Sequence, residues 1–182
     1  MLISRRDFFG SLWTDMKYFA GTAIKTITPE RTLIRPPGAI EEIAFLAGCR
    51  RCGMCKEVCP EKAIRIAGPQ MGNSFGTPYL EPSEVPCSFC LKCVEVCPSE
   101  ALLIQNDDVS HAIGVASIDP ERCLAYNQQL CSSCVYACPT DIKAIRLEDF
   151  QYPKIDQEKC IGCGQCARIC LAPDSAIKVV PR

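Results

Sequence analysis

Hydrophobic residues recur at three- and four-residue steps near the start of the chain, which predicts an amphipathic helix over residues 5–27. The apolar stripe consists of Phe8, Phe9, Leu12, Trp13, Met16, Phe19, Ala20, Ala23, Ile24 and Ile27. Thr28-Pro29 is expected to end this helix, because proline cannot continue one. A Pro-Pro-Gly turn at 36–38 then precedes a second, shorter helix predicted over 40–46.

The hydrophobic pattern changes to short runs after residue 60. These runs predict strands at 63–66, 101–104, 115–119, 143–147, 154–156 and 177–180. The segments 67–86 and 105–114 are rich in glycine, proline, asparagine and aspartate, and are predicted to be surface hairpin loops. Short helices that alternate with short strands predict the α+β fold class.

Cysteine organises the chain from residue 49 onward. The 16 cysteines form four groups, of which three have the spacing C-x2-C-x2-C-x3-C and the third group has a longer first gap. In chain order, motifs 1 to 4 are Cys49-Cys52-Cys55-Cys59, Cys87-Cys90-Cys93-Cys97, Cys123-Cys131-Cys134-Cys138 and Cys160-Cys163-Cys166-Cys170. Proline follows the first three motifs directly, at Pro60, Pro98 and Pro139. This is the ligand spacing of bacterial ferredoxins, so the sequence predicts four [4Fe-4S] clusters as cofactors.

Two other uses of cysteine compete with this interpretation. The cysteine density is also typical of disulfide-rich secreted proteins. However, cysteines at i, i+3 and i+6 lie in one tight loop, which is a poor way to join distant segments. Structural zinc also uses C-x2-C, but usually as two separated pairs rather than a triplet with a distant fourth cysteine. The spacing therefore favours iron–sulfur clusters over both alternatives.

The fourth cysteine of each motif is expected to bind the cluster of a second motif, as in two-cluster ferredoxins. If neighbouring motifs pair, the ligand sets are Cys49, Cys52, Cys55 and Cys97; Cys87, Cys90, Cys93 and Cys59; Cys123, Cys131, Cys134 and Cys170; and Cys160, Cys163, Cys166 and Cys138. A nested arrangement, motif 1 with 4 and motif 2 with 3, would exchange only the fourth ligands. The prediction is of tandem ferredoxin-like domains at 46–110 and 111–182, after an N-terminal segment at 1–45.

Charge and other motifs narrow the function further. With 20 basic and 21 acidic residues the net charge is −1, which gives no electrostatic footprint for nucleic acid. The sequence contains no run of 18 apolar residues, so it predicts no membrane-spanning helix. It also contains no nucleotide-binding or metalloprotease motif. His111, the single histidine, lies in a polar loop and is assigned no catalytic role. The sequence therefore predicts an electron carrier with no catalytic residues, rather than an enzyme.

The first motif and its lead-in resemble the MauM/NapG type of ferredoxin. The resemblance covers essentially the whole chain and rests on Arg35-Pro36-Pro37-Gly38-Ala39, Phe45, Cys49-Arg50-Arg51-Cys52-Gly53-Met54-Cys55 and the long gap from Cys123 to Cys131. It implies an accessory redox protein that passes electrons between a membrane-bound, quinol-oxidising partner and a periplasmic oxidoreductase. It equally allows an accessory factor that supplies electrons for the maturation of a partner enzyme.

The N-terminal segment leaves two locations open. Ser4-Arg5-Arg6-Asp7-Phe8-Phe9 is similar to a twin-arginine export signal, which would carry a folded, cluster-loaded protein to the periplasm. The same Ser4-x-x-Asp7 is a capping box, which would open an uncleaved helix that docks on a membrane surface or a partner subunit at the cytoplasmic face. Both predict a membrane-associated protein.

The residues between the cysteines predict unequal clusters. Arg50, Arg51 and Lys56 place positive charge around motif 1, and this charge is expected to favour the reduced, more negative state of its cluster. Phe89 and Leu91 make motif 2 more apolar. We expect the motif 2 cluster to be the harder of the two to reduce.

Overall fold

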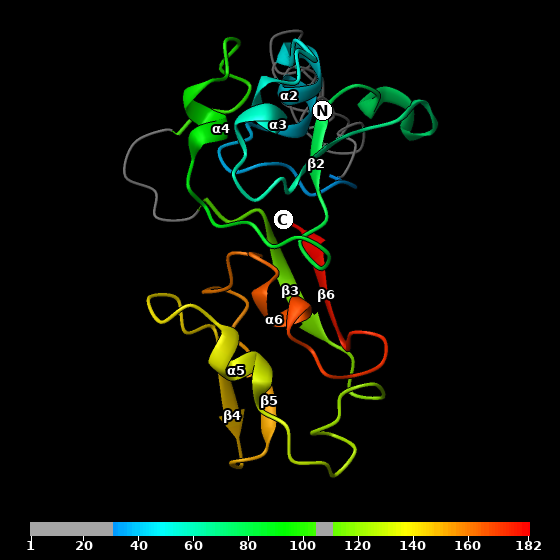
Figure 1. Cartoon of the computed structure of the whole chain (residues 1–182), viewed down its shortest axis with the longest axis vertical. Coiled ribbons are helices and arrows are strands. Elements are labelled where there is room, and N and C mark those ends of the chain that lie inside the picture. Colours follow the sequence, from blue (N-terminus) through cyan, green and yellow to red (C-terminus); the bar gives the residue numbers. More distant parts are fainter. Residues whose placement is uncertain (1–30, 105–110) are drawn as a thin grey trace, which may run out of the picture. The chain divides into compact units, whose positions relative to one another are not determined.

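The computed structural model describes residues 31–104 and 111–182 (Figure 1). The amphipathic helix predicted over 5–27 and most of the loop predicted at 105–114 lie outside these residues. We refer to residues 31–104 as the first half and to residues 111–182 as the second half. Within the two halves, no helix is both long and apolar enough to cross a membrane.

The first half carries motifs 1 and 2. Its elements are α2 (Glu42–Gly48), α3 (Met54–Val58), β1 (Ile64–Ile66), the 3-10 helix η1 (Pro69–Ser74), β2 (Pro78–Leu80) and α4 (Lys92–Glu95). β1 pairs with β2 in an antiparallel ladder. α3 contains the third cysteine of motif 1 and packs against α4, which contains the third cysteine of motif 2. The two motifs of this half are therefore held face to face by their helices.

The second half repeats this plan with motifs 3 and 4. Its elements are β3 (Gly114–Ile118), α5 (Ser133–Ala137), β4 (Ile145–Glu148), β5 (Tyr152–Ile155), α6 (Gln165–Arg168) and β6 (Ile177–Pro181). β3 pairs with β6 and β4 with β5, both antiparallel. α5 packs against α6 as α3 packs against α4. Tandem ferredoxin-type halves of mixed helix and strand are thus confirmed, and five of the six predicted strands lie close to their predicted bounds.

Two predictions for the first half are wrong, one of them only in part. Residues 101–104 form no strand, because only an isolated bridge joins Leu102 to Ala39. The segment opposite residues 101–104 is the one that leads into Ala39. It contains Pro36 and Pro37, which have no N–H group to donate, so the bridge cannot extend into a ladder. The surface hairpin loop predicted at 67–86 is right only in part: residues 67–77 connect the antiparallel strands β1 and β2 and contain η1, but residues 78–80 are the buried strand β2. The glycines and prolines of that segment surround a core strand too short to show a period.

Arg35 fixes the lead-in segment to the first half. Its guanidinium is buried, donates a hydrogen bond to the Glu42 carboxylate at 2.5 Å, and lies 4.8 Å from the centre of the Phe45 ring. Its other acceptors are the Thr77 hydroxyl at 2.8 Å, the Pro78 carbonyl at 2.9 Å and the Ser74 hydroxyl at 3.0 Å. One side chain therefore joins the lead-in, α2, η1 and β2. The domain boundary at 45/46 stays a prediction, although this lead-in packs within the first half.

Candidate iron–sulfur cluster sites

The structure gathers the cysteines of the first half into two sets of four. One pocket, with an empty volume of about 360 Å³, is lined by Cys49, Cys52, Cys55 and Cys97. A second pocket of about 340 Å³ is lined by Cys59, Cys87, Cys90 and Cys93. Each set takes three cysteines from one motif and the fourth from the other. The pairing within this half is therefore motif 1 with motif 2.

The second half has the same arrangement. A pocket of about 320 Å³ is lined by Cys138, Cys160, Cys163 and Cys166. In the remaining set, the Cys134 thiol is close enough to Cys123, Cys131 and Cys170 for all three to raise its pKa. We refer to the four sets by the motif that supplies three of their cysteines. Their membership matches sequential pairing of the motifs, and the binding of iron by each set stays a prediction.

The thiols of the motif 1, motif 2 and motif 4 sets each line a pocket. In residues 31–104 and 111–182, no three histidine, cysteine, aspartate or glutamate side chains are placed to hold a single metal ion. All 16 cysteines are free of disulfides. A cubane cluster needs four thiolates around a volume, whereas one zinc ion needs them around a point. The preference for [4Fe-4S] clusters over zinc therefore rests on the cysteine spacing.

Left-handed backbone conformations bend the cysteine loops around these pockets. In motif 1, the residues on either side of Cys52 are Arg51 (φ 55°) and Gly53 (φ 77°). In motif 2, the same two positions are Phe89 (φ 54°) and Leu91 (φ 60°). Residues other than glycine adopt this conformation at a cost of about 1–2 kcal/mol each. Motif 2 therefore has two strained residues beside its second cysteine, and motif 1 has one, Arg51.

Burial controls the acidity of the thiols. It raises the pKa of several of them, and neighbouring cysteines of the same set and of adjacent sets add to the effect. The pKa is about 11 for Cys55, Cys87 and Cys134 and about 12 for Cys93 and Cys166. These thiols are protonated at neutral pH when no metal is present, whereas iron binds the thiolate. Loading of the sites is therefore expected to release protons.

Backbone N–H groups point at the sulfur of the fourth cysteine in three motifs. The N–H of Ala144 lies 3.2 Å from the Cys138 sulfur, and the N–H of Ala176 lies 3.4 Å from the Cys170 sulfur. At Cys97, burial acts to raise the pKa, but hydrogen bonds from Leu102 and from residues 99 and 101 lower it overall. Such donors stabilise negative charge on sulfur and tune the potential of a bound cluster.

Arg51 has a structural role that the sequence did not reveal. Its guanidinium donates to the carbonyls of Phe75 at 2.9 Å, Cys49 at 3.2 Å and Leu46 at 3.4 Å. It therefore ties the motif 1 loop to α2 and to the end of η1. These hydrogen bonds hold the positive charge of Arg51 beside the motif 1 cysteines. A charge held there is what the expected effect on the reduction potential of a bound cluster requires.

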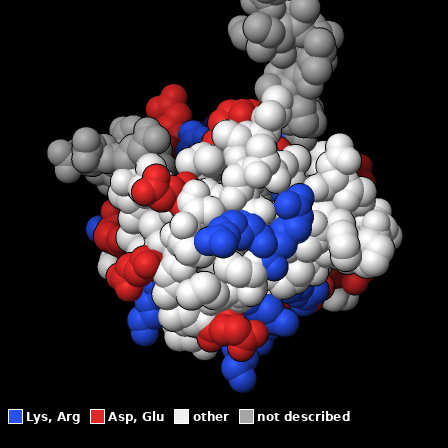
Figure 2. Space-filling model, turned by 90° about the horizontal axis from the view of Figure 1, so that it is seen from above, with Lys and Arg blue, Asp and Glu red and all other residues white. Residues whose placement is uncertain are grey.

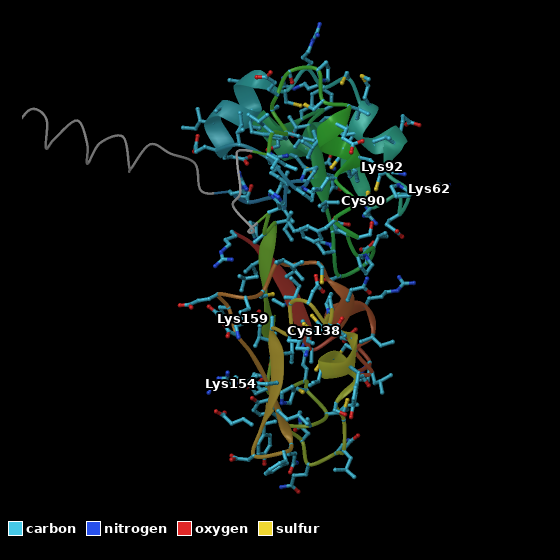
Figure 3. All side chains as sticks on the ribbon, turned by 90° about the vertical axis from the view of Figure 1, so that its left-hand side faces the viewer. Lys62, Cys90, Lys92, Cys138, Lys154 and Lys159 are labelled. Carbon is cyan, nitrogen blue, oxygen red and sulfur yellow. The ribbon has the colours of Figure 1, made fainter. Side chains whose placement is uncertain are left out.

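The second cysteine of motifs 1 and 2 is exposed, while the other fourteen cysteines are buried or half-buried. Figure 3 labels the exposed Cys90 together with Lys62 and Lys92 in the first half, and Cys138 in the second half. Lys62 and Lys92 are themselves exposed. The first half therefore offers partners two accessible thiols in basic surroundings.

Comparison with known proteins places the chain among ferredoxin-type proteins. A family model described as a 4Fe-4S dicluster domain matches residues 48–101, 86–142 and 129–173. The methylamine utilization ferredoxin-type protein MauM of Methylobacillus flagellatus is 39% identical over 165 residues, which cover 85% of this chain and 70% of that protein. The ferredoxin-type protein NapG of Escherichia coli is 37% identical over 162 residues, which cover 81% of this chain and 70% of that protein. The chain belongs to the MauM/NapG family of ferredoxin-type proteins.

Membership of the MauM/NapG family confirms the resemblance of the lead-in and of motif 1. This protein is accordingly an iron–sulfur protein of the electron-transfer class, with 4Fe-4S dicluster domains. The middle match, 86–142, spans motifs 2 and 3, so the family model by itself does not choose between sequential and nested pairing. No solved structure matches the chain.

Proposed function

We propose that this MauM/NapG-type ferredoxin passes electrons between a membrane-associated redox protein and an oxidoreductase, through four [4Fe-4S] clusters held by the four cysteine sets. The observation that carries the proposal is that all 16 free cysteines fall into sets of four, each with three cysteines from one motif and one from its neighbour. When bound, such a cluster gains or loses one electron without exchanging atoms.

The protein's own residues support transfer rather than catalysis. Each set offers four thiolates, which leaves no open position where a substrate could bind iron. The N–H groups of residues such as Ala144 and Ala176 lie against cysteine sulfurs and would stabilise negative charge on a bound cluster. We therefore assign the chain to electron carriage, with no catalytic residue.

Exposed basic groups support docking of a redox partner at the first half. Arg50, Arg51 and Lys56 are exposed around motif 1 and its accessible Cys52. Figure 2 shows lysine and arginine side chains gathered on one face of the molecule, over a largely uncharged surface. Complementary charge on a partner would speed its approach to such a face.

Anaerobic titration with a one-electron reductant tests the proposed function. The holoprotein is expected to take up about four electrons per chain and to return them to an oxidised one-electron acceptor protein. A Cys52→Ala variant should take up about three. Delivery of the electrons only to an unassembled partner enzyme, and not to the mature acceptor protein, would instead favour the maturation role.

The N-terminal segment is proposed to bring the protein to its membrane partner. The apolar stripe within residues 5–27 contains three phenylalanines and a tryptophan, and these side chains need an apolar partner surface if they form one face of a helix. Deletion of residues 1–30 is expected to leave the iron content unchanged and to abolish association with membranes or the partner complex, as measured by flotation with membrane vesicles. Loss of iron in the truncated protein would show that the segment packs internally.

A further inference from the structure

One contact between the two halves joins the segment that precedes motif 2 to the loop of motif 4. The N–H of Cys87 donates a hydrogen bond to the carbonyl of Cys163 at 3.0 Å. The Arg168 guanidinium, at the end of α6, donates to the carbonyl of Glu84 at 2.7 Å. We name the contact of residues 82–87 with residues 163–168 the junction. It brings together a cysteine of the motif 2 set and a cysteine of the motif 4 set.

Gly164 shows how closely the two chains approach at the junction. Its backbone is left-handed, with φ +86°, and a Cβ atom there would lie 2.0 Å from the carbonyl oxygen of the buried Pro82. Gly53 holds the same place in motif 1 with φ +77°, but a Cβ atom there would meet nothing within 4 Å. Leu91 holds this place in motif 2 with φ 60°. The conformation alone therefore does not require glycine, whereas the contact with Pro82 does.

We propose that electrons cross between the halves at the junction, so that the four cysteine sets are used in the order motif 1, motif 2, motif 4, motif 3. The motif 1 and motif 3 sets then lie at the two ends of the electron path. Motif 4 comes before motif 3 on this path, although it follows motif 3 in the sequence. This inference rests on the proposed function. A reduced redox protein supplies one electron at one end and an oxidised one removes it at the other, and no proton or bond is exchanged.

The order can be tested with two matched variants, Cys90→Ala and Cys52→Ala. Each removes the exposed second cysteine of its motif, and alanine cannot bind iron in its place. Removal of the inner motif 2 cluster should leave the motif 1 cluster without a neighbour. The fully reduced Cys90→Ala protein should therefore show one magnetically isolated signal of about one spin per chain by electron paramagnetic resonance. Cys52→Ala should show none, because its three remaining clusters are still contiguous.

Three results would overturn the order. An isolated signal in both variants would mean that the two halves do not communicate. An isolated signal in Cys52→Ala alone would place the motif 1 set next to the second half, and an isolated signal in neither would mean that motif 1 also borders another set. Failure of the proposed function has a different appearance, because the unmodified protein would then take up no electrons reversibly.

Gly164→Val and Gly53→Val provide a second test that leaves every cysteine in place. Both introduce a β-branched side chain at a left-handed residue, but only Gly164→Val drives Pro82 away. Both proteins should keep full iron content. Gly164→Val should lose the magnetic interaction between the halves, so that its spectrum becomes that of two separate cluster pairs. If both fully loaded variants give the unmodified spectrum, the junction does not connect the halves.

Discussion

Replacement of Cys131 by alanine is expected to remove one cluster, or about four iron atoms per chain, and to destabilise the second half more than the first. Cys131 belongs to the motif 3 set, whose members all lie in the second half. Its Cys123 lies in a buried cluster with three alanines, Ala125, Ala172 and Ala176, whereas its Cys134 packs in a second buried cluster that includes Ile145 and Ile177. Alanine side chains bury little apolar surface, so a bound cluster is expected to supply much of what stabilises the residues around Cys123.

Iron analysis combined with amide hydrogen exchange measures this effect. Exchange should accelerate over the residues around motif 3 and remain slow in the first half. Cys52→Ala is the matched control, because the first half has a larger apolar core that includes Phe45, Ile64 and Leu80. Its own half should therefore be destabilised less. Equal loss of protection across both halves of the Cys131→Ala protein would contradict two separately stabilised units.

Arg35→Ala is expected to destabilise the folded protein by about 3–5 kcal/mol. The reason is that the buried Glu42 carboxylate then loses one of its two arginine partners. The Arg35 side chain is fully buried, and the Glu42 side chain is 7% exposed. The substitution also empties the space over the Phe45 ring and leaves the Thr77 and Ser74 hydroxyls without their donor. The urea midpoint, followed by the cluster absorbance of the holoprotein, measures the loss.

Arg65→Ala is the control for this prediction. Arg65 also bonds two acidic groups, Glu81 and Glu84, but its side chain is 41% exposed. Exposed ion pairs contribute about 0–1 kcal/mol, so this variant should unfold close to the unmodified protein. If Arg35→Ala is as mild as Arg65→Ala, the lead-in segment is not fixed to the core in the way described.

The sequence shows the four cysteine motifs because their spacing is local. Three thiols at i, i+3 and i+6 must share one loop, and this spacing is legible without any tertiary information. The sequence does not show whether the motifs pair sequentially or in a nested way, since both arrangements use the same cysteine loops. It depends on which helices pack together, and only the structure places α3 against α4 and α5 against α6.

The residues that the sequence left unexplained act over long distances. Arg35 and Thr77 are 42 positions apart, so nothing local marks them as partners. Gly164 looked like one more loop glycine, although it differs from Gly53 in the approach of Pro82. Strand β2 escaped notice because it has three residues, all buried, and therefore no alternating pattern.

The iron and acid-labile sulfide content of the anaerobically purified protein tests the central claim most directly. Four sets of four thiolates predict about sixteen iron and sixteen sulfide per chain, in equal amounts. The measurement needs no partner and no assumption about the order of the sets. A protein with about four zinc ions per chain and little sulfide would contradict the account, because its cysteines would then hold single ions rather than clusters.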